Sequence, residues 1–307
     1  MIPTAPPDFR SGFVALIGRP NVGKSTIMNR LIGQKVAITS PVAQTTRNRL
    51  RGILTRDDAQ VIFVDTPGIH KPHHSLGEVL VKNAIAAINA VDLVLFVTDG
   101  SVPPGKGDGF IEEILGRSQT PVIWGSNKID LVPDDPAQRT EAEQRYRVLA
   151  EQHDWPYYPF SAVTDEGLDA LLLQLIARLP PGPYYYPPDL ITDQPERFIM
   201  GELIREQILV LTREEVPHSV AITIDRVEED PKITRILATV HVERPSQKAI
   251  LIGKSGTMMK EIGTQARQQI QKLVMGKVYL EVFVKVQPKW RQSNQKLAEL
   301  GYRVESD

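Results

Sequence analysis

The residues best placed for chemistry lie near the start of the chain, in the run Gly18-Arg19-Pro20-Asn21-Val22-Gly23-Lys24-Ser25. This run fits the pattern G-x-x-x-x-G-K-[S/T], in which backbone N–H groups surround the phosphates of a bound nucleotide. Lys24 would bring a cation to the β- and γ-phosphates, and the Ser25 hydroxyl can bind Mg²⁺. We expect the phosphate contacts to come from six consecutive residues: Asn21, Val22, Gly23, Lys24, Ser25 and Thr26.

A second motif, Asp65-Thr66-Pro67-Gly68, ends the apolar run 61–65. At the end of a strand, the Asp65 carboxylate would emerge at the sheet edge where open α/β folds bind ligands, and it would hold Mg²⁺ through water. Pro67 and Gly68 would then lie near the γ-phosphate, with the Gly68 N–H free to approach it. Without the phosphate loop this tetrapeptide would indicate only a strand and a turn.

A third motif, Asn127-Lys128-Ile129-Asp130, points to guanine as the base. The Asp130 carboxylate can accept from both N1–H and the exocyclic amine of guanine, whereas adenine would leave that carboxylate facing a lone pair. We expect Asn127 to contact the N7/O6 edge and the Lys128 stem to cover the ring. The dipeptide Ser161-Ala162 would add a backbone N–H to guanine O6.

The elements that must hold these motifs alternate between short β-branched runs and helical patterns. Strands are predicted over 13–17, 61–65, 93–98 and 122–124, and helices over 24–32, 75–90, 138–152 and 166–179. The runs 48–55 and 60–65 resemble an antiparallel hairpin. The first part of the chain is therefore expected to be an α/β domain with a mixed, doubly wound sheet.

A proline-rich stretch divides the chain, because residues 180–188 hold five prolines in nine positions. We predict a first domain over 1–180, a linker over 181–195 and a second domain over 196–307 that ends in a helical tail. The second domain shows a helix (196–211), two strands (217–228 and 233–243), a helix pair around a Gly-containing turn (247–273) and a strand (277–286). It is a smaller α+β domain.

Charge is spread unevenly although the net charge is only −1. Residues 244–303 carry 12 Lys and Arg against 3 Asp and Glu, whereas residues 189–243 carry 6 against 12. Such a basic block favours a polyanionic partner over a merely solvated face. The absence of cysteine excludes disulfides and Cys-ligated metals, and no apolar run approaches the roughly 18 residues of a membrane helix, so we expect a cytoplasmic protein.

Taken in order, the motifs over 18–162 resemble the G domain of the small GTPases, a P-loop fold. The resemblance implies GTP and GDP as ligands, Mg²⁺ as cofactor, slow GTP hydrolysis and two mobile switch segments. The first switch would be Gln44-Thr45-Thr46-Arg47, with Thr46 the first candidate for the Mg²⁺ ligand, Thr45 the second, and neither as the remaining alternative. The implied catalytic residues are Lys24, Thr46 and Gly68, and the implied metal ligands are Ser25, Thr46 and Asp65.

Position 69 departs from the pattern of signalling GTPases, because it holds Ile69 where they carry a water-orienting glutamine. An aliphatic side chain cannot align water, so another group must do so or turnover must be slow. The substitution resembles bacterial GTPases in which an asparagine at the place of Asn21 helps to hold K⁺. Asn21 also has a simpler explanation, since asparagine tolerates left-handed backbone in a glycine-rich loop.

The turn Gly253-Lys254-Ser255-Gly256 lies between two predicted helices inside the basic block. A G-x-x-G turn lets backbone N–H groups approach a nucleic-acid strand closely, and the order of elements resembles the type II KH domain. The candidate RNA contacts are Gly253, Lys254, Ser255, Gly256, Lys285, Lys289, Trp290 and Arg291. For Trp290 an anchoring role in the tail is an equal alternative to stacking on a base.

Motifs over 10–303, among them Lys277-Val278-Tyr279-Leu280-Glu281 and Glu299-Leu300-Gly301-Tyr302, make the whole chain resemble the Era family of bacterial ribosome-assembly GTPases. The resemblance implies hydrolysis of GTP to GDP, binding of single-stranded RNA at the 3′ end of 16S rRNA, and a role in assembling the small ribosomal subunit. A monomer is expected, and peripheral association with the inner membrane face stays open. The alternative is a nucleotide-dependent switch whose second domain recruits a protein or membrane partner; salt-dependent RNA binding separates the two.

Overall fold

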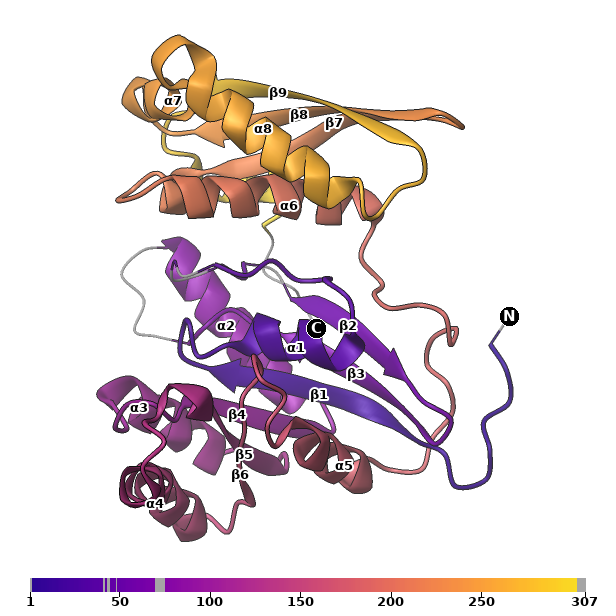
Figure 1. Cartoon of the computed structure of the whole chain (residues 1–307), viewed down its shortest axis with the longest axis vertical. Coiled ribbons are helices and arrows are strands. Elements are labelled where there is room, and N and C mark those ends of the chain that lie inside the picture. The colour runs from indigo at the N-terminus through magenta and orange to yellow at the C-terminus, as the bar shows by residue number, and fades with distance from the viewer. Residues whose placement is uncertain (1, 41, 43–44, 48, 70–74, 303–307) are drawn as a thin grey trace. The chain divides into compact units, whose positions relative to one another are not determined.

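A computed structural model gives the fold and describes residues 2–40, 42, 45–47, 49–69 and 75–302 (Figure 1). Contacts divide the chain into two compact units, the first formed mainly by residues up to 193 and the second mainly by the residues that follow. Residues 38–45 group with the second unit.

The first unit is built on a six-stranded sheet with the order β2-β3-β1-β4-β5-β6. Its elements in chain order are β1 (Arg10–Gly18), α1 (Lys24–Ile32), β2 (Leu50–Thr55), β3 (Ala59–Asp65), α2 (Ser75–Asn89), β4 (Leu93–Asp99), α3 (Lys106–Gly116), β5 (Val122–Asn127), α4 (Pro136–Gln152), β6 (Tyr157–Pro159) and α5 (Leu168–Arg178). Strand β2 runs antiparallel to β3, and the other neighbouring strands are parallel. The predicted mixed sheet is confirmed.

Helices cover both faces of this sheet, which is why its strands are apolar almost throughout. Ile17, Phe96 and Trp124 share a core with residues of α2, α3 and α4 on one face. Helices α1 and α5 contact the sheet through β1, β2 and β3. Because the strands are parallel, the carboxyl ends of β1, β3, β4 and β5 meet at one edge, and three of the predicted motifs begin there.

Helix α3 was not predicted from the sequence, since Gly107 and Gly109 at its start disfavour a helix. The structure supplies a compensating contact. The fully buried side chain of Asp108 accepts a hydrogen bond from the Gly105 N–H, 2.9 Å from nitrogen to oxygen, and so caps the first turn.

The segment predicted as a linker is bonded to the first unit along much of its length. The side-chain oxygen of Gln60 accepts from the N–H groups of Tyr185 and Tyr186 at 2.8 and 3.0 Å. The Ile53 N–H of β2 donates to the Ile191 carbonyl at 2.8 Å. Backbone pairing therefore continues to about residue 193, beyond the proline run.

The second unit packs its helices on a three-stranded sheet with the order β7-β8-β9. Its elements are α6 (Glu196–Leu211), β7 (Ala221–Asp230), β8 (Ile233–Val242), α7 (Pro245–Ile252), α8 (Thr257–Ile270), β9 (Lys277–Val286) and α9 (Asn294–Glu299). Strand β8 pairs antiparallel with β7 and parallel with β9. The predicted first strand begins later than expected, because Pro217–Ser219 form a 3-10 turn.

Within the part of the chain that the structure describes, no helix combines the length and the apolar character needed to cross a membrane.

Candidate functional site

The phosphate loop begins where β1 ends and closes where α1 begins, as its sequence predicts. Asn21 has a left-handed backbone with φ 65°, which agrees with its simpler explanation. Val22 is buried and Gly23 takes φ 101°. Ser25 and Thr26 follow in the first turn of the helix, so the six predicted contacts line one loop.

Lys24 is folded back into that loop. Its ammonium donates to the carbonyls of Gly18 and Arg19, at nitrogen-to-oxygen distances of 3.1 and 2.9 Å. Burial lowers the pKa of Lys24 to about 8, against the opposing attraction of Asp65. A phosphate entering the loop would replace these two neutral carbonyl acceptors with an anionic one, and charge-assisted hydrogen bonds are the stronger kind.

The three predicted metal ligands meet at one point. The Ser25 and Thr46 hydroxyls each donate to the same Asp65 oxygen, Oδ2, at 2.6 and 2.9 Å, and the two hydroxyl oxygens are 3.1 Å apart. Burial raises the pKa of Asp65, partly offset by Lys24 and by the two hydroxyls. The other carboxylate oxygen, Oδ1, is buried and has no hydrogen-bond partner among the described residues. Three clustered oxygen groups with one unsatisfied anionic oxygen suit Mg²⁺.

Neighbouring threonines in the first switch lie in different surroundings. Thr46 reaches Asp65, whereas the Thr45 hydroxyl donates to the Val42 carbonyl at 2.8 Å. The Thr45 carbonyl accepts a hydrogen bond from Arg205. Of the two threonines, Thr46 is therefore the one that lies beside the predicted Mg²⁺ ligands Ser25 and Asp65. Gln44, which the prediction also placed in this switch, falls outside the described residues.

Residues 65–69 bring the second motif against the phosphate loop. A Cβ on Gly68 would lie 2.6 Å from the Pro20 nitrogen, so any other residue would push the two loops apart. Pro67, just before it, is buried. Ile69 is fully buried among residues of β1 and α2, and its N–H donates to the Gly18 carbonyl at 3.2 Å. The side chain at position 69 therefore belongs to the core and cannot orient water.

Asn127 connects two loops of the site through its side-chain amide. Its side-chain nitrogen donates to the Val22 carbonyl at 2.8 Å, and its oxygen accepts from the Ala162 N–H at 3.0 Å. One buried amide thus ties the phosphate loop to the Ser161-Ala162 loop. The Ser161 N–H donates to the Glu166 carbonyl at 2.8 Å. Both N–H groups of the dipeptide predicted to contact guanine O6 therefore have partners within the chain.

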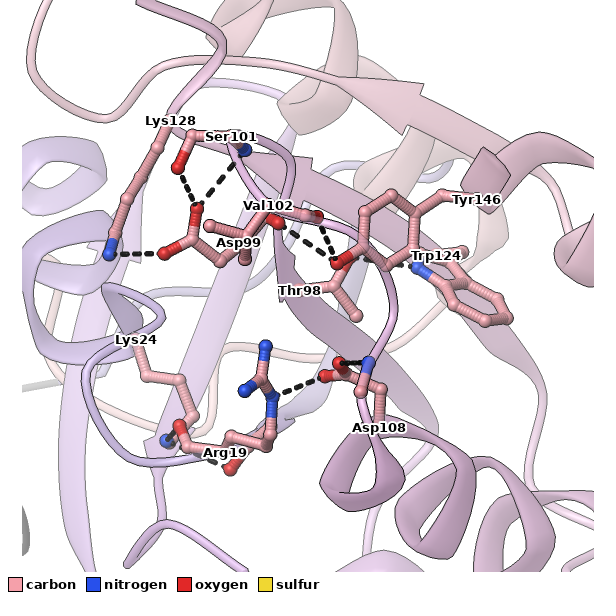
Figure 2. A network of polar contacts seen from close by, with 12 residues as sticks. Arg19, Lys24, Thr98, Asp99, Ser101, Val102, Asp108, Trp124, Lys128 and Tyr146 are labelled. Atoms are coloured by element: carbon pink, nitrogen blue, oxygen red, sulfur yellow. Dashed lines mark hydrogen bonds and ion pairs between the residues drawn. The ribbon is translucent and has the colours of Figure 1, made fainter. Parts of the chain in front are cut away.

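Asp130 and Lys128, the other two residues of the base motif, differ in their contacts. Asp130 has a buried carboxylate oxygen, Oδ1, that lacks a hydrogen-bond partner in the described part of the chain. Such an oxygen suits the paired N–H donors of guanine, since leaving it unbonded is costly. Lys128 has a left-handed backbone with φ 68°, and its ammonium contacts Asp99 at 2.6 Å, which fixes the stem expected to cover the ring (Figure 2).

The predicted RNA turn is exposed and sharply bent. Gly253 and Gly256 have φ 73° and 79°, in the region that glycine occupies most readily, and Ser255 between them has φ 53°. The side chains of Lys254 and Ser255 are exposed. The turn joins α7 to α8 and presents its backbone and one cation to solvent.

Beyond β9 the predicted RNA contacts divide into two groups. Lys285 and Lys289 are exposed. Trp290 is fully buried, donates its indole N–H to the Ser219 carbonyl at 3.1 Å and stacks on Tyr302. Arg291 is ion-paired with Glu243. The structure thus favours the anchoring alternative for Trp290, because a ring with no exposed surface cannot stack on a base.

Family models match both units. Residues 13–128 match the model described as 50S ribosome-binding GTPase, and residues 215–291 match the KH domain model. The chain is 69% identical to GTPase Era of Nostoc sp. strain PCC 7120 over 304 residues, which cover 99% of this chain and 93% of that one. The chain belongs to the Era family. It is 64% identical to GTPase Era of Synechocystis sp. strain PCC 6803 over 304 residues, covering 99% and 96%.

Two solved Era structures match this chain with a TM-score of 0.91 and 37% identity, covering 96% of this chain and 99% of each of theirs. One is Era in complex with MgGDPNP and nucleotides 1506–1542 of 16S ribosomal RNA. The other is a variant of Aquifex aeolicus Era bound to GDP and AlF4⁻. The predicted fold is confirmed: an α/β G domain followed by a KH domain. As a member of the Era family, the chain is a GTP hydrolase.

In this Era-family chain, two acidic residues that the sequence analysis missed support the nucleotide site (Figure 2). Asp108 pairs with Arg19 of the phosphate loop at 2.6 Å. Burial of Asp99 acts to raise its pKa, but hydrogen bonds from Lys128 and Ser101 outweigh this and leave the pKa below its usual value. Asp99 ends strand β4 just as Asp65 ends β3, so an acid directly after a predicted strand was the available signal.

Proposed function

We propose that this Era-family GTPase binds the 3′ end of 16S rRNA through its KH domain and acts, as a monomer in the cytoplasm, in assembly of the small ribosomal subunit. One observation carries the RNA part of the proposal: an exposed G-x-x-G turn, bent at Gly253 and Gly256, inside a segment with 12 basic and 3 acidic residues. The rRNA in the complex of the solved relative supports the choice of target.

For hydrolysis we propose that Lys24 holds the β- and γ-phosphates while the Gly68 N–H approaches the γ-phosphate. Ser25 and Thr46 would ligate Mg²⁺, with Asp65 bonded to them or to a metal-bound water. The ion supplies positive charge where negative charge develops during phosphoryl transfer. The oxygen cluster at Asp65 and the MgGDPNP in the solved relative support this assignment. Asp130 would select guanine.

We further propose that K⁺ occupies a site beside the phosphates, with Asn21 among its ligands. The buried Ile69 supports this, because the chain offers no side chain at that position to orient water. GTP hydrolysis by the full chain should fall at least about tenfold when K⁺ is replaced by Na⁺, because a site sized for K⁺ holds the smaller Na⁺ poorly and the transition state then loses one positive charge beside it. Steady-state phosphate release measures it, and Asn21→Ala should reduce the difference. Equal rates in the two salts would contradict the K⁺ site.

The RNA assignment is tested with Gly256→Asp. An added carboxylate in the turn repels phosphate, and its backbone at φ 79° is strained, so affinity for a single-stranded 3′-terminal 16S rRNA oligonucleotide should fall at least about tenfold. Fluorescence anisotropy measures the affinity, and GTP binding by the same variant should be unchanged.

The matched control is Gly263→Asp, which adds the same charge to α8 of the same unit at a position where a Cβ meets nothing within 4 Å. It should retain most of the affinity. RNA binding by Gly256→Asp at the level of the unsubstituted chain would instead favour a second domain that recruits a protein or a membrane.

A further inference from the structure

Strand β9 shows an unusual outer face. Its inner residues, among them Val278 and Leu280, pack on the core formed with α6 and α8. The residues between them point the other way, because side chains alternate along a strand. In order they are Lys277, Tyr279, Glu281, Phe283 and Lys285.

Two aromatic rings on this face are open to solvent. Tyr279 is 51% exposed and Phe283 is 50% exposed. They lie four residues apart on one strand, about 13 Å at 3.3 Å per residue, too far to cover each other. Each ring thus offers a separate flat face to solvent, and a nucleic-acid base can stack on such a face.

The polar groups around the rings favour an anion. Lys277 and Lys285 are the exposed ends of the row, and the exposed Arg235 of β8 is the register partner of Tyr279. Glu281 is the one acid in the row.

Strand β7, on the other side of β8, carries the remaining acids of this sheet face, Asp225, Glu228 and Asp230, together with Arg226. Glu228 is ion-paired with Arg226 at 2.5 Å, and Asp225 accepts hydrogen bonds from the hydroxyls of Thr223 and Thr239 at 2.9 and 2.6 Å. Around the rings, on β9 and the neighbouring β8, the face carries three cations and one acid, whereas its β7 side carries three acids and one cation.

We propose that this face is a second RNA-binding surface, on which unpaired bases stack upon Tyr279 and Phe283. We call it the β9 platform, and its residues are Arg235, Lys277, Tyr279, Glu281, Phe283 and Lys285. Rings that alternate with cations match the two parts of a single strand, flat bases and charged phosphates. Glu281 accepts from an exocyclic amino group, such as N4 of cytosine, and gives the platform a base preference.

The platform is separate from the G-x-x-G turn. That turn joins α7 and α8, whose residues Leu251 and Ile262 pack on the inner face of the sheet. A KH groove holds four nucleotides. The proposal rests on the proposed function, and it extends the bound RNA beyond those four nucleotides onto the opposite face.

Two probes separate the surfaces: a four-nucleotide RNA that only the groove can hold, and a single-stranded RNA of about twelve nucleotides that contains the same four. For the full chain with GTP, Phe283→Ala should lower the affinity for the longer probe about fivefold to a hundredfold, because one stacked base is lost. The affinity for the shorter probe should not change. Phe283→Trp should retain the affinity. Leu173→Ala, which removes an apolar side chain 55% exposed on α5, is the matched control and should change neither.

Photo-crosslinking tests the unsubstituted chain directly. A longer probe carrying 5-iodouridine should crosslink to peptides that contain Tyr279 or Phe283, because ring stacking brings the halogenated base against the aromatic side chain. A hairpin of equal length should not compete for these crosslinks, since its bases are already stacked.

The outcomes distinguish this inference from the function on which it rests. Unchanged binding of the longer probe by Phe283→Ala, together with crosslinks elsewhere, overturns the platform and leaves the KH groove standing. Competition by the hairpin overturns it in favour of duplex recognition. If Gly256→Asp binds both probes like the unsubstituted chain, the proposed function itself fails.

Discussion

At the residue scale, Lys24 and Asp65 show how burial prepares charges for a ligand. Each group is nearly removed from water, and burial shifts each pKa toward the neutral form. Their mutual attraction opposes both shifts without cancelling them. A phosphate beside Lys24 and a metal ion beside Asp65 would therefore stabilise the charged forms of both side chains.

We predict a pH dependence from Lys24. In the free protein its pKa is about 8, and phosphates raise it, so the bound state holds more protons above pH 8. GTP affinity should fall by up to about tenfold per pH unit above that point, and binding at about pH 8.5 should take up most of one proton. Titration calorimetry in buffers of different ionisation enthalpy measures the uptake. Lys24→Arg, which stays charged, should show none, and binding without uptake by the unsubstituted chain would contradict the prediction.

Spacing in the sequence predicts which residues share a site better than it predicts their partners. Ser25, Thr46 and Asp65 meet as expected, because strand ends and loop patterns fix where they emerge. Asn127 could not be assigned in the same way. A buried amide has donors and an acceptor, and only the fold decides whether they meet a base or the backbone of two loops.

At the element scale, most strands and helices follow from periodicity, and the exceptions include helix α3 and the three-residue strand β6, which was not among the predicted strands. Helix α3 depends on its cap, Asp108, which outweighs two glycines. The ion pair between Asp108 and Arg19 is non-local, and such a contact leaves no trace in a short sequence window. The bonds of the segment before α6 are likewise non-local, since Gln60 lies more than a hundred residues away.

The tail after β9 depends on Trp290, and we predict that Trp290→Ala lowers the free energy of unfolding by about 3–5 kcal/mol, as expected for a buried indole. The Ser219 carbonyl also loses its donor. Urea unfolding followed by circular dichroism measures the change. Met275→Ala, at a side chain 92% exposed, should stay within about 0.5 kcal/mol. A similarly small effect at Trp290 would show that the tail does not anchor there.

At the scale of the whole molecule, the uneven charge predicts that RNA binding and nucleotide binding respond differently to salt. If four phosphates are neutralised by the basic segment, the logarithm of RNA affinity should fall with the logarithm of KCl concentration with a slope of about −3. Occupancy of the buried nucleotide site should change little over about 50 to 200 mM KCl, because buried charges are screened less. Parallel titrations with RNA and GDP measure both slopes, and equal slopes would contradict the assignment.

The buried Ile69 limits how the rate of GTP hydrolysis could be raised by substitution. Its side chain fills the core and its N–H is bonded to the phosphate loop, so a glutamine introduced there would have to bury an amide among apolar groups or disrupt the packing that holds the loop. A glutamine at position 69 alone is therefore not expected to raise the rate of GTP hydrolysis. If K⁺ fills the proposed site beside the phosphates, the lifetime of the triphosphate state depends on an ion taken from solution.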